Sequence, residues 1–550
     1  MPTLDWIGKK AVEKHHEEVP FHLLKCDNSL SVGDPGSGNL IVQGDNLVAL
    51  KALLPYYAGK VDCIYIDPPY NTGAEGWIYN DNVNSPEIKE WLGKVVGAEA
   101  EDLSRHDKWL CMMLPRISTL YKMLSEDGQI FVSIDDHELD NLIQILDIVF
   151  GRSRQVGILS WYKKRKGSFL SKELVSVTEY VVVYRKGKKA ALYGGAPNEE
   201  ESQPILKRGN RTKVIKFPAK TVQTKLENGA HKVGVKGTGT TAMKLLDEIL
   251  VQDGVIVDEF RLEGPFVWGQ EMLDEELSRG GVCVINTENF QPRVFRKFAE
   301  GHHKGLSSFI DGRTMSATND DAFEELREIF HTDRLFAYSK PKNLVKHLIR
   351  AATNYSKDSI VLDSFAGSGT TAHAVMQLNK EDGGNRKFIL VEMDQNICEN
   401  ITAERVKRVA LGYKNQKGQQ VEGLGGGFRY CTLGETLFDA DGEIRKEVKF
   451  SDLARHIYLT ETGEPLPKQN NGRSPLLGVH HGTAYYLLYN GILGDKTAQG
   501  GNVLTRAVLA ELPEHEGPKV IYGTGCRLGK KRLDEMQTQF RQIPGKVVVR

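Results

Sequence analysis

Short apolar segments that stop at an acidic side chain are the feature that most restricts the fold of this sequence. Between about residues 39 and 186, three such segments end near Asp45, Asp67 and Asp135. Helical stretches at about 107–124 and 137–150 flank the third segment. Alternation of short apolar strands with amphipathic helices is typical of βαβ units, so we expect an α/β fold with a mostly parallel sheet.

A second region of the same kind lies far along the chain, at about residues 337–413. It contains a helical stretch and two apolar strands, at 360–362 and 388–391. Two strands alone do not make a stable open sheet, so we expect them to complete the sheet that begins near residue 39. The predicted domains are an N-terminal extension (1–38), a first core half (39–189), an insertion (190–335), a second core half (336–415) and a C-terminal α+β domain (425–550).

Length and composition fit a globular protein of several domains. The chain has 550 residues, 40% of them hydrophobic, with 72 Lys plus Arg and 72 Asp plus Glu. These values exclude a single small binding module and the profile of a disordered chain. Zero net charge does not exclude nucleic acid, because contact with phosphates depends on local patches. One such patch, 207–244, holds ten Lys or Arg and a single acid, Glu227.

The cysteines and the N-terminus indicate where such a chain works. The seven cysteines are scattered and form no CxxC pair, so we expect neither a disulfide framework nor a cysteine-based zinc site. The N-terminus has no apolar signal segment, and no stretch approaches the roughly 18 uncharged apolar residues of a membrane span. We therefore predict a cytoplasmic protein that needs no metal and no membrane.

The segment Asp67-Pro68-Pro69-Tyr70 follows an apolar strand directly. Ligands of open α/β sheets bind outside the carboxyl ends of the strands. Two prolines remove two backbone donors and leave carbonyls that only accept, and beside a carboxylate they form an acceptor-rich edge suited to an amino group. The ring of Tyr70 offers a face for stacking a planar base, worth about 1–3 kcal/mol. A rigid surface turn is the alternative reading of the tetrapeptide alone.

A glycine-containing loop, Asp363–Thr371, lies between a strand and a helix. Glycines at that junction let the backbone approach a ligand closely and leave amide groups at the helix start free to bind it. Glu392 ends the next strand, 25 residues after Gly367, near the spacing at which an acid binds ribose hydroxyls in dinucleotide folds. One glycine fewer than in GxGxxG favours a nucleoside cofactor without pyrophosphate, such as S-adenosylmethionine.

These segments carry a resemblance to a known family. In their order along the chain they resemble β-class amino-methyltransferases acting on DNA, and most closely the modification (Mod) subunits of type III restriction-modification systems. The similarity covers about 39–186 and 335–412, and more weakly the tail, and it lies in four segments, Ile66–Gly73, Ser133–Glu138, Lys340–Leu344 and Phe365–Thr371. It implies a Rossmann-like, circularly permuted methyltransferase fold with an inserted target-recognition domain.

The resemblance also implies residue roles. The catalytic segment would be Asp67, Pro68, Pro69 and Tyr70. Asp67 and Pro68 would accept hydrogen bonds from the target amino group, and Tyr70 would stack on a base flipped out of the duplex. The S-adenosylmethionine site would comprise Asp363, Phe365, Gly367, Ser368, Gly369, Thr370 and Thr371, with Glu392 on the ribose, Asp45 near the adenine, and Lys340, Pro341 and Asn343 near the methionine end.

Partners follow from the same resemblance. The substrate would be double-stranded DNA, held in part by basic side chains at 163–166 (Lys163, Lys164, Arg165, Lys166) and in the insertion (Lys207, Arg208, Arg211, Lys213). As in Mod subunits, the protein would form a homodimer and join a separate helicase-nuclease (Res) subunit. Because the chain itself shows no helicase or convincing nuclease motif, any cleavage of DNA would require that partner. The C-terminal domain (425–550) would dock a partner or the second copy of a dimer, contact DNA, or only pack on the core.

Three functions remain open on the sequence. The first is methylation of adenine N6, which the Asp-Pro-Pro-Tyr segment favours within this family. The second is methylation of another amino group, in cytosine N4, RNA or a protein glutamine. The third is a recognition subunit whose main task is to direct a partner helicase-nuclease.

Overall fold

A computed structural model describes most of the chain. The structure describes residues 5–6, 8–72, 105–166, 174–188, 191–298, 302–332, 335–336, 338–439, 441–467, 474–489, 492–494 and 501–543. The predicted match at Gly73 therefore lies outside the described residues. Contacts divide the chain into a large unit, 1–192 with 307–550, and a smaller one, Tyr193–Leu306.

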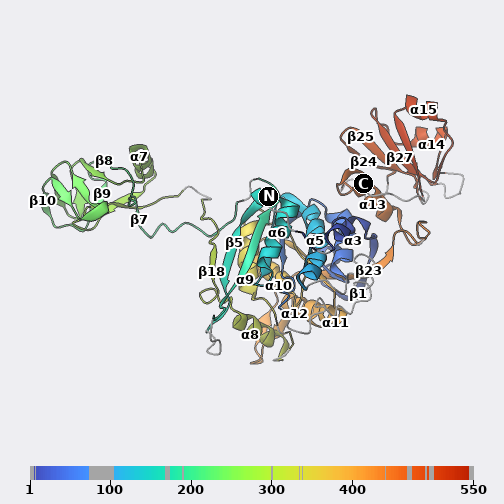
Figure 1. Ribbon diagram of the computed structural model, residues 1–550, viewed down its shortest axis with the longest axis horizontal. Coiled ribbons are helices and arrows are strands. Elements are labelled where there is room, and N and C mark those ends of the chain that lie inside the picture. The colour runs from blue at the N-terminus through green and yellow to red at the C-terminus, as the bar shows by residue number, and fades with distance from the viewer. Residues whose placement is uncertain are drawn as a thin grey trace. The chain divides into compact units, whose positions relative to one another are not determined.

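A ten-stranded sheet forms the centre of the large unit, in the order β1-β23-β2-β20-β19-β3-β4-β6-β5-β18. Its two ends, β1 with β23 and β5 with β18, lie on opposite sides of this unit (Figure 1). The six strands from β23 to β4 pair in parallel, β6 runs antiparallel to both β4 and β5, and β1 runs antiparallel to β23. The strands are β1 (His22–Val32), β2 (Leu40–Gln43), β3 (Val61–Ile66), β4 (Leu124–Ile134), β5 (Gln155–Tyr162), β6 (Thr178–Arg185), β18 (Phe309–Asp311), β19 (Ile360–Asp363), β20 (Lys387–Glu392) and β23 (Phe428–Thr436).

The two sequence regions share this sheet, as predicted. Val361 and Leu362 of β19 pair with Cys63 and Ile64 of β3, although about 300 residues separate them along the chain. On its other side β19 pairs with β20, and β20 pairs with β2. The second region therefore completes the sheet that the first begins.

Helices cover the sheet because their apolar residues recur at helical spacing. In α5, Trp109, Met113, Ile117 and Leu120 lie on one buried face. The chain crosses from β2 to β3 and from β19 to β20 in opposite directions, so right-handed crossovers place their connecting helices on opposite faces. The helices of this core are α3 (Asn46–Tyr57), α5 (Arg105–Met123), α6 (Leu139–Phe150), α8 (Asn319–Phe330), α9 (Lys342–Thr353), α10 (Thr370–Asp382), α11 (Gln395–Ile397) and α12 (Glu404–Leu411), with a π-helical turn η5 (Cys398–Ala403).

The sheet edge formed by β1 and β23 differs from the prediction in two ways. Cys26 and Cys431 face each other in the antiparallel register and form a disulfide, whereas the scattered cysteines predicted none. Residue 425 is also no domain boundary, because β23 pairs with β2 inside the main sheet. Both features depend on pairing between segments about 400 residues apart, which no local pattern reveals. The helices α1 (Lys9–Val12) and α2 (His15–Glu18) precede β1, and the 3-10 turn η1 (Pro35–Ser37) lies between β1 and β2.

The smaller unit is a β-rich domain with its own core. Buried side chains such as Phe217, Phe260 and Phe266 fill the space between a seven-stranded sheet, β10-β13-β14-β9-β16-β17-β7, and a four-stranded sheet, β11-β12-β15-β8. Its elements are β7 (Gln203–Pro204), β8 (Lys213–Phe217), β9 (Val222–Thr224), β10 (Gly229–His231), β11 (Gly234–Lys236), η4 (Gly239–Thr241), β12 (Met243–Leu245), β13 (Ile249–Gln252), β14 (Val255–Ile256), β15 (Phe260–Gly264), α7 (Gln270–Ser278), β16 (Val282–Ile285) and β17 (Arg293–Phe295).

This unit is shorter than the predicted insertion of 190–335. Phe309–Asp311 pairs in parallel with β5 of the main sheet, and α8 packs on α12 of the core. The predicted bounds came from a change in composition, which does not show that residues 309–311 pair with a strand of the main sheet. The separate unit accordingly ends at Leu306.

The last part of the large unit holds a four-stranded sheet, β24-β25-β27-β29, and a two-stranded one, β26-β28. Three of the four strands are parallel, with a helix before each crossover. Its elements are α13 (Phe450–Thr462), β24 (Leu476–His480), β25 (Thr483–Leu487), β26 (Val503–Leu504), α14 (Arg506–Glu511), β27 (Lys519–Gly523), β28 (Gly525–Cys526), α15 (Lys530–Glu535) and β29 (Thr538–Gln542), after the hairpin β21 (Gly412–Lys414) and β22 (Gln420–Glu422). None of the described helices is both long and apolar enough to cross a membrane.

Candidate active site

Three carboxylates meet at the carboxyl edge of the sheet. Asp67 follows β3, Asp363 ends β19 and Glu392 ends β20, three strands that are neighbours in the sheet. They line a cavity of about 660 Å³, within the usual size of a small-molecule site. The residues that the cavity brings together therefore come from both predicted core halves.

Asp67 has one carboxylate oxygen engaged and one unengaged. Its Oδ2 accepts a hydrogen bond of 2.8 Å from the Lys340 ammonium. Its Oδ1 is buried and accepts no hydrogen bond from the described residues. Burial raises the pKa of this carboxyl, and the Lys340 charge opposes that shift. A buried acceptor without a donor is costly in a folded protein, so this oxygen is suited to a ligand N–H.

The rest of the Asp-Pro-Pro-Tyr segment is held rigidly. The Trp109 indole donates to the Pro69 carbonyl at 2.7 Å, whereas no described residue donates to the Pro68 carbonyl. The ring of Tyr70 is buried, and its hydroxyl donates to Glu179 Oε2 at 3.1 Å. Within the described part of the chain, the segment thus holds two acceptors without a donor, Asp67 Oδ1 and the Pro68 carbonyl.

The loop after β19 is built on its carboxylate. Asp363 accepts from the Phe365 amide through Oδ1 and from the Thr371 hydroxyl through Oδ2, and burial raises its pKa to about 7. Gly367 has φ +49° and Gly369 has φ +77°, left-handed conformations that favour glycine. A Cβ at Gly367 would lie 3.2 Å from the ring of Phe336. Here the backbone comes close to the cavity wall.

Glu392 joins this loop to the neighbouring strand. Its Oε2 accepts from the Gly367 amide at 2.8 Å, and its Oε1 accepts from the Asp394 amide at 3.0 Å. Burial raises the pKa of Glu392 to about 7. Beside it, Phe336, Phe365 and Ile397 give the cavity an apolar wall. A carboxylate next to flat apolar surfaces fits the ribose and base of a nucleoside.

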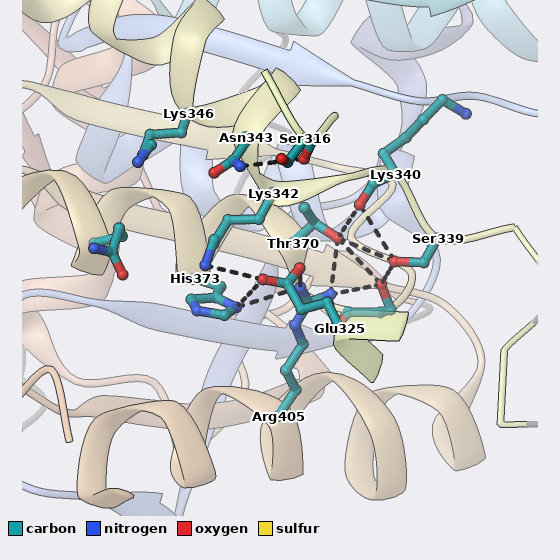
Figure 2. A network of polar contacts seen from close by, with 12 residues as sticks. Ser316, Glu325, Ser339, Lys340, Lys342, Asn343, Lys346, Thr370, His373 and Arg405 are labelled. Carbon is teal, nitrogen blue, oxygen red and sulfur yellow. Dashed lines mark hydrogen bonds and ion pairs between the residues drawn. The ribbon is translucent and has the colours of Figure 1, made fainter. Parts of the chain in front are cut away.

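A buried ionic network supports the loop from below (Figure 2). The fully buried Arg405 of α12 donates to Ser368 Oγ at 3.0 Å, to Thr370 Oγ1 at 2.9 Å and to Glu325 Oε2 at 2.8 Å. Lys342 also pairs with Glu325, at 3.0 Å. Although burial opposes it, the surrounding cations lower the pKa of Glu325 to about 2. The network ties α8, α9 and α12 to the loop.

The structure brings most of the predicted site residues together. The cavity is lined by predicted residues from the catalytic segment and the cofactor site: Asp67, Pro69, Tyr70, Lys340, Asp363, Phe365, Gly367, Ser368, Thr370, Thr371 and Glu392. Five predicted residues do not line the cavity: Pro68, Gly369, Pro341, Asn343 and Asp45.

Three of the predicted cofactor positions have other partners in the structure. Asp45 caps α3 through the amides of Leu47 and Val48 and pairs with Arg116, because it directly precedes the helix. The Asn343 amide donates to backbone carbonyls of the segment before α8. Lys340 lies on Asp67 and over the Tyr70 ring, and so belongs to the catalytic segment.

The predicted DNA contacts divide into three groups. Lys163 lines the cavity and donates to Glu179, and Arg165 pairs with two acids of α8, so neither is a free surface cation. Lys164 and Lys166 flank Arg165 and have no partner among the described residues. The four cations of the smaller unit, Lys207, Arg208, Arg211 and Lys213, are exposed and form no ion pair within the described part of the chain.

Several lining residues are not among the predicted site residues. Glu179 stands at the start of β6, and Phe336, Tyr338 and Ser339 precede Lys340. Thr72, Asp135, Asn319, Phe323 and Asn396 complete the rim of the cavity with Tyr65, Ala366, Asp394 and Ile397. Thr72, Asp135 and Ala366 do lie inside the segments Ile66–Gly73, Ser133–Glu138 and Phe365–Thr371 that carry the resemblance, and Phe336, Tyr338 and Ser339 lie just before Lys340–Leu344. For the other residues of this group the sequence gives no signal. In the described part of the chain, no cluster of His, Cys, Asp and Glu is arranged to hold a metal ion.

Comparison with known proteins now adds to this geometry. The model of the DNA methylase family (N6_N4_Mtase) matches residues 61–404, more than half of the chain. The Mod subunit of the type III restriction-modification enzyme StyLTI from Salmonella typhimurium is 31% identical over 492 residues, covering 84% of this chain and 70% of the relative. The EcoPI Mod subunit from Escherichia phage P1 is 30% identical, with 75% and 66% covered.

Solved structures give a more distant match. The complex of M1.HpyAVI with SAM is 12% identical, with a TM-score of 0.31, over 67% of this chain and 99% of that one. On the family model and the Mod relatives together, the chain belongs to the DNA methylase family, as an S-adenosylmethionine-dependent DNA methyltransferase of the type III Mod kind.

Proposed function

We propose that this chain transfers a methyl group from S-adenosylmethionine to N6 of adenine in double-stranded DNA. It does so as the modification subunit of a type III-like restriction-modification or related defence system. The proposal is supported by the Mod relatives and by the four matching segments in family order. The order of segments also supports a circularly permuted methyltransferase core.

The observation that carries the proposal is the unengaged pair of acceptors at the catalytic segment. Asp67 Oδ1 and the Pro68 carbonyl both lack donors from the described residues. An exocyclic amino group has two N–H donors and fits two such acceptors. Tyr70 adds a buried ring beside them, on which a flipped base can stack.

These residues act by positioning and electrostatics. Accepting both N–H bonds, Asp67 and Pro68 direct the nitrogen lone pair away from themselves and stabilise the positive charge that develops on the nitrogen. When bound, S-adenosylmethionine supplies the methyl group: the N–C bond forms as the C–S bond breaks, sulfur keeps the electron pair and the nitrogen then releases a proton.

The residues present fit the cofactor. Glu392 offers a buried carboxylate to ribose hydroxyls, and the apolar wall of Phe336, Phe365 and Ile397 suits an adenine ring. At Gly367 a Cβ would press against that wall, so the loop is shaped for close approach of backbone to ligand. Ser368, Gly369, Thr370 and Thr371 continue the loop into the first turn of α10.

Cofactor affinity is expected to depend on pH. Burial holds the pKa of Glu392 at about 7, so this group is mostly ionised at pH 8 and mostly protonated at pH 6. If the ionised form accepts the ribose hydroxyls, affinity for S-adenosylmethionine falls about tenfold from pH 8 to pH 6. Calorimetric titration at both pH values measures this, with Glu392→Gln expected to bind weakly and to vary less. Equal affinity of the unaltered protein at both pH values contradicts the role.

DNA contact and partners complete the proposal. The unit at 193–306 reads the DNA sequence, and its exposed cations Lys207, Arg208, Arg211 and Lys213 contact phosphates, as do Lys164 and Lys166. The protein forms a homodimer and joins a separate Res subunit; the names of its relatives, which are each a Mod subunit of a type III restriction-modification enzyme, support its place in an enzyme of several subunits. The part of the predicted C-terminal domain (425–550) that follows β23 contacts a partner subunit, a second copy of the chain or DNA.

A transfer assay tests the proposed reaction. The purified protein is incubated with methyl-labelled S-adenosylmethionine and, separately, unmethylated double-stranded DNA, RNA and a protein extract. Label in N6-methyladenine of the DNA is the expected result. Label in cytosine contradicts the base assignment, and label only in RNA or protein contradicts the substrate class.

A further inference from the structure

Four charged side chains meet around the Tyr70 ring in the cavity. The Lys340 ammonium lies 2.8 Å from Asp67 Oδ2, 3.8 Å from Glu179 Oε2 and 4.7 Å from the centre of the Tyr70 ring. The Lys163 ammonium donates to the other oxygen of Glu179 at 2.9 Å. Two carboxylates and two ammonium groups thus balance one another.

Glu179 connects the members of this cluster. It stands at the start of β6, and because β6 is antiparallel to β4, its first residues lie at the carboxyl edge beside Asp67. Its side chain is 9% exposed, and its two oxygens accept from Tyr70 and Lys163. Burial opposes ionisation, yet the two lysines hold the pKa of Glu179 below its usual value. Glu179 is therefore a buried charge with fixed partners.

Without this carboxylate, the cluster would carry an excess positive charge. Of the carboxylates that pair with Lys163 and Lys340 among the described residues, only Asp67 would then remain, with Asp135 adding a weaker attraction to Lys340. An excess positive charge a few ångströms from a nitrogen that becomes positive during methyl transfer disfavours that transition state. The Tyr70 hydroxyl would also lose the acceptor that fixes its ring.

We propose that Glu179 is a positioning residue for methyl transfer: it fixes the Tyr70 ring and neutralises the two lysines, leaving the charge of Asp67 available to the target amino group. This inference rests on the proposed function, because it assigns Asp67 and Tyr70 their roles there. Glu179 touches neither substrate nor cofactor in this assignment. It acts through Tyr70, Lys163 and Lys340.

The variant Glu179→Gln tests the charge while keeping an acceptor for Tyr70. We expect the maximal rate of methyl transfer to unmethylated DNA to fall about 10- to 100-fold. The Kd for S-adenosylmethionine and the midpoint of thermal unfolding stay near those of the unaltered protein. The matched control is Glu126→Gln, because the Glu126 side chain on β4 is 85% exposed. This variant is expected to keep the full rate.

A double variant separates charge balance from simple loss of structure. In Glu179→Gln/Lys163→Met, one negative and one positive charge are removed together, so the cluster is neutral again. We expect it to recover most of the lost rate. It also decides the question if Glu179→Gln alone fails to fold, since it leaves no unpaired ammonium.

Full activity of Glu179→Gln overturns the inference. So does a double variant that is folded and binds S-adenosylmethionine but is no faster than Glu179→Gln. If Glu179→Gln does not fold, a folded double variant that binds the cofactor and has at most a hundredth of the rate of the unaltered protein overturns it. The unaltered protein is assayed first. If it places no label in adenine, the proposed function fails whatever the variants do. If it methylates adenine and Glu179→Gln does so equally well, only the role of Glu179 fails.

Discussion

Replacement of Asp67 by alanine is expected to reduce the rate of methyl transfer by at least about a thousandfold. The change removes the buried Oδ1 acceptor. It also removes the negative charge of the carboxylate, whose Oδ2 accepts a hydrogen bond from the Lys340 ammonium. The target amino group then loses its main acceptor and its electrostatic stabilisation, while the Glu392 end of the cavity stays intact. Affinity for S-adenosylmethionine is therefore expected to change little.

The measurement is the single-turnover rate with labelled S-adenosylmethionine and unmethylated DNA, together with calorimetric titration of the cofactor. Asp127→Ala is the matched control, because Asp127 is exposed on β4 and lies outside the cavity. The control is expected to transfer methyl groups at the full rate. An Asp67→Ala variant that keeps even a tenth of the rate would exclude Asp67 as the acceptor.

The second large effect is expected on stability. Arg405→Met removes a fully buried guanidinium that donates to the cofactor loop and pairs with Glu325 (Figure 2). Loss of one partner from a buried ion pair leaves the other charge short of compensation, at a cost of about 3 kcal/mol in the free energy of unfolding. Because Ser368 and Thr370 lose their donor, affinity for S-adenosylmethionine is expected to fall about tenfold as well.

Denaturant unfolding of the whole chain measures the first effect, and titration with cofactor measures the second. Lys407→Met on the same helix is the control, because this side chain is half exposed and its pair with Glu404 contributes little. Substitution of both Glu325 and Arg405 by methionine should destabilise the protein less than the sum of the single changes. Equal stability of Arg405→Met and Lys407→Met would show that the network does not hold the loop.

The parts of the site that follow one strand directly could be predicted from the sequence. The apolar run of β3 stops at Asp67 and that of β19 at Asp363, so both side chains had to lie at the carboxyl edge of a parallel sheet. The loop after β19 could be predicted from its glycines alone. Local patterns suffice there because strand, turn and chemistry are contiguous.

The remaining parts depend on pairings between distant segments. Glu179 reaches the edge only because β6 is antiparallel, and a sequence pattern does not give strand direction. Arg405 is buried under the loop that follows β19, and the side chains of this network come from three separate helices, α8, α9 and α12. Asp45 is different: an Asp directly before an apolar helix is a helix cap, and that local signal competes with the cofactor role that the resemblance implied.

Nucleoside mass spectrometry tests the central claim most directly. DNA is taken from a host without adenine methylation of its own that expresses either this protein or its Asp67→Ala variant. We expect N6-methyladenine with the unaltered protein and none with the variant. N6-methyladenine at equal levels in both samples, or N4-methylcytosine in place of N6-methyladenine, would contradict it.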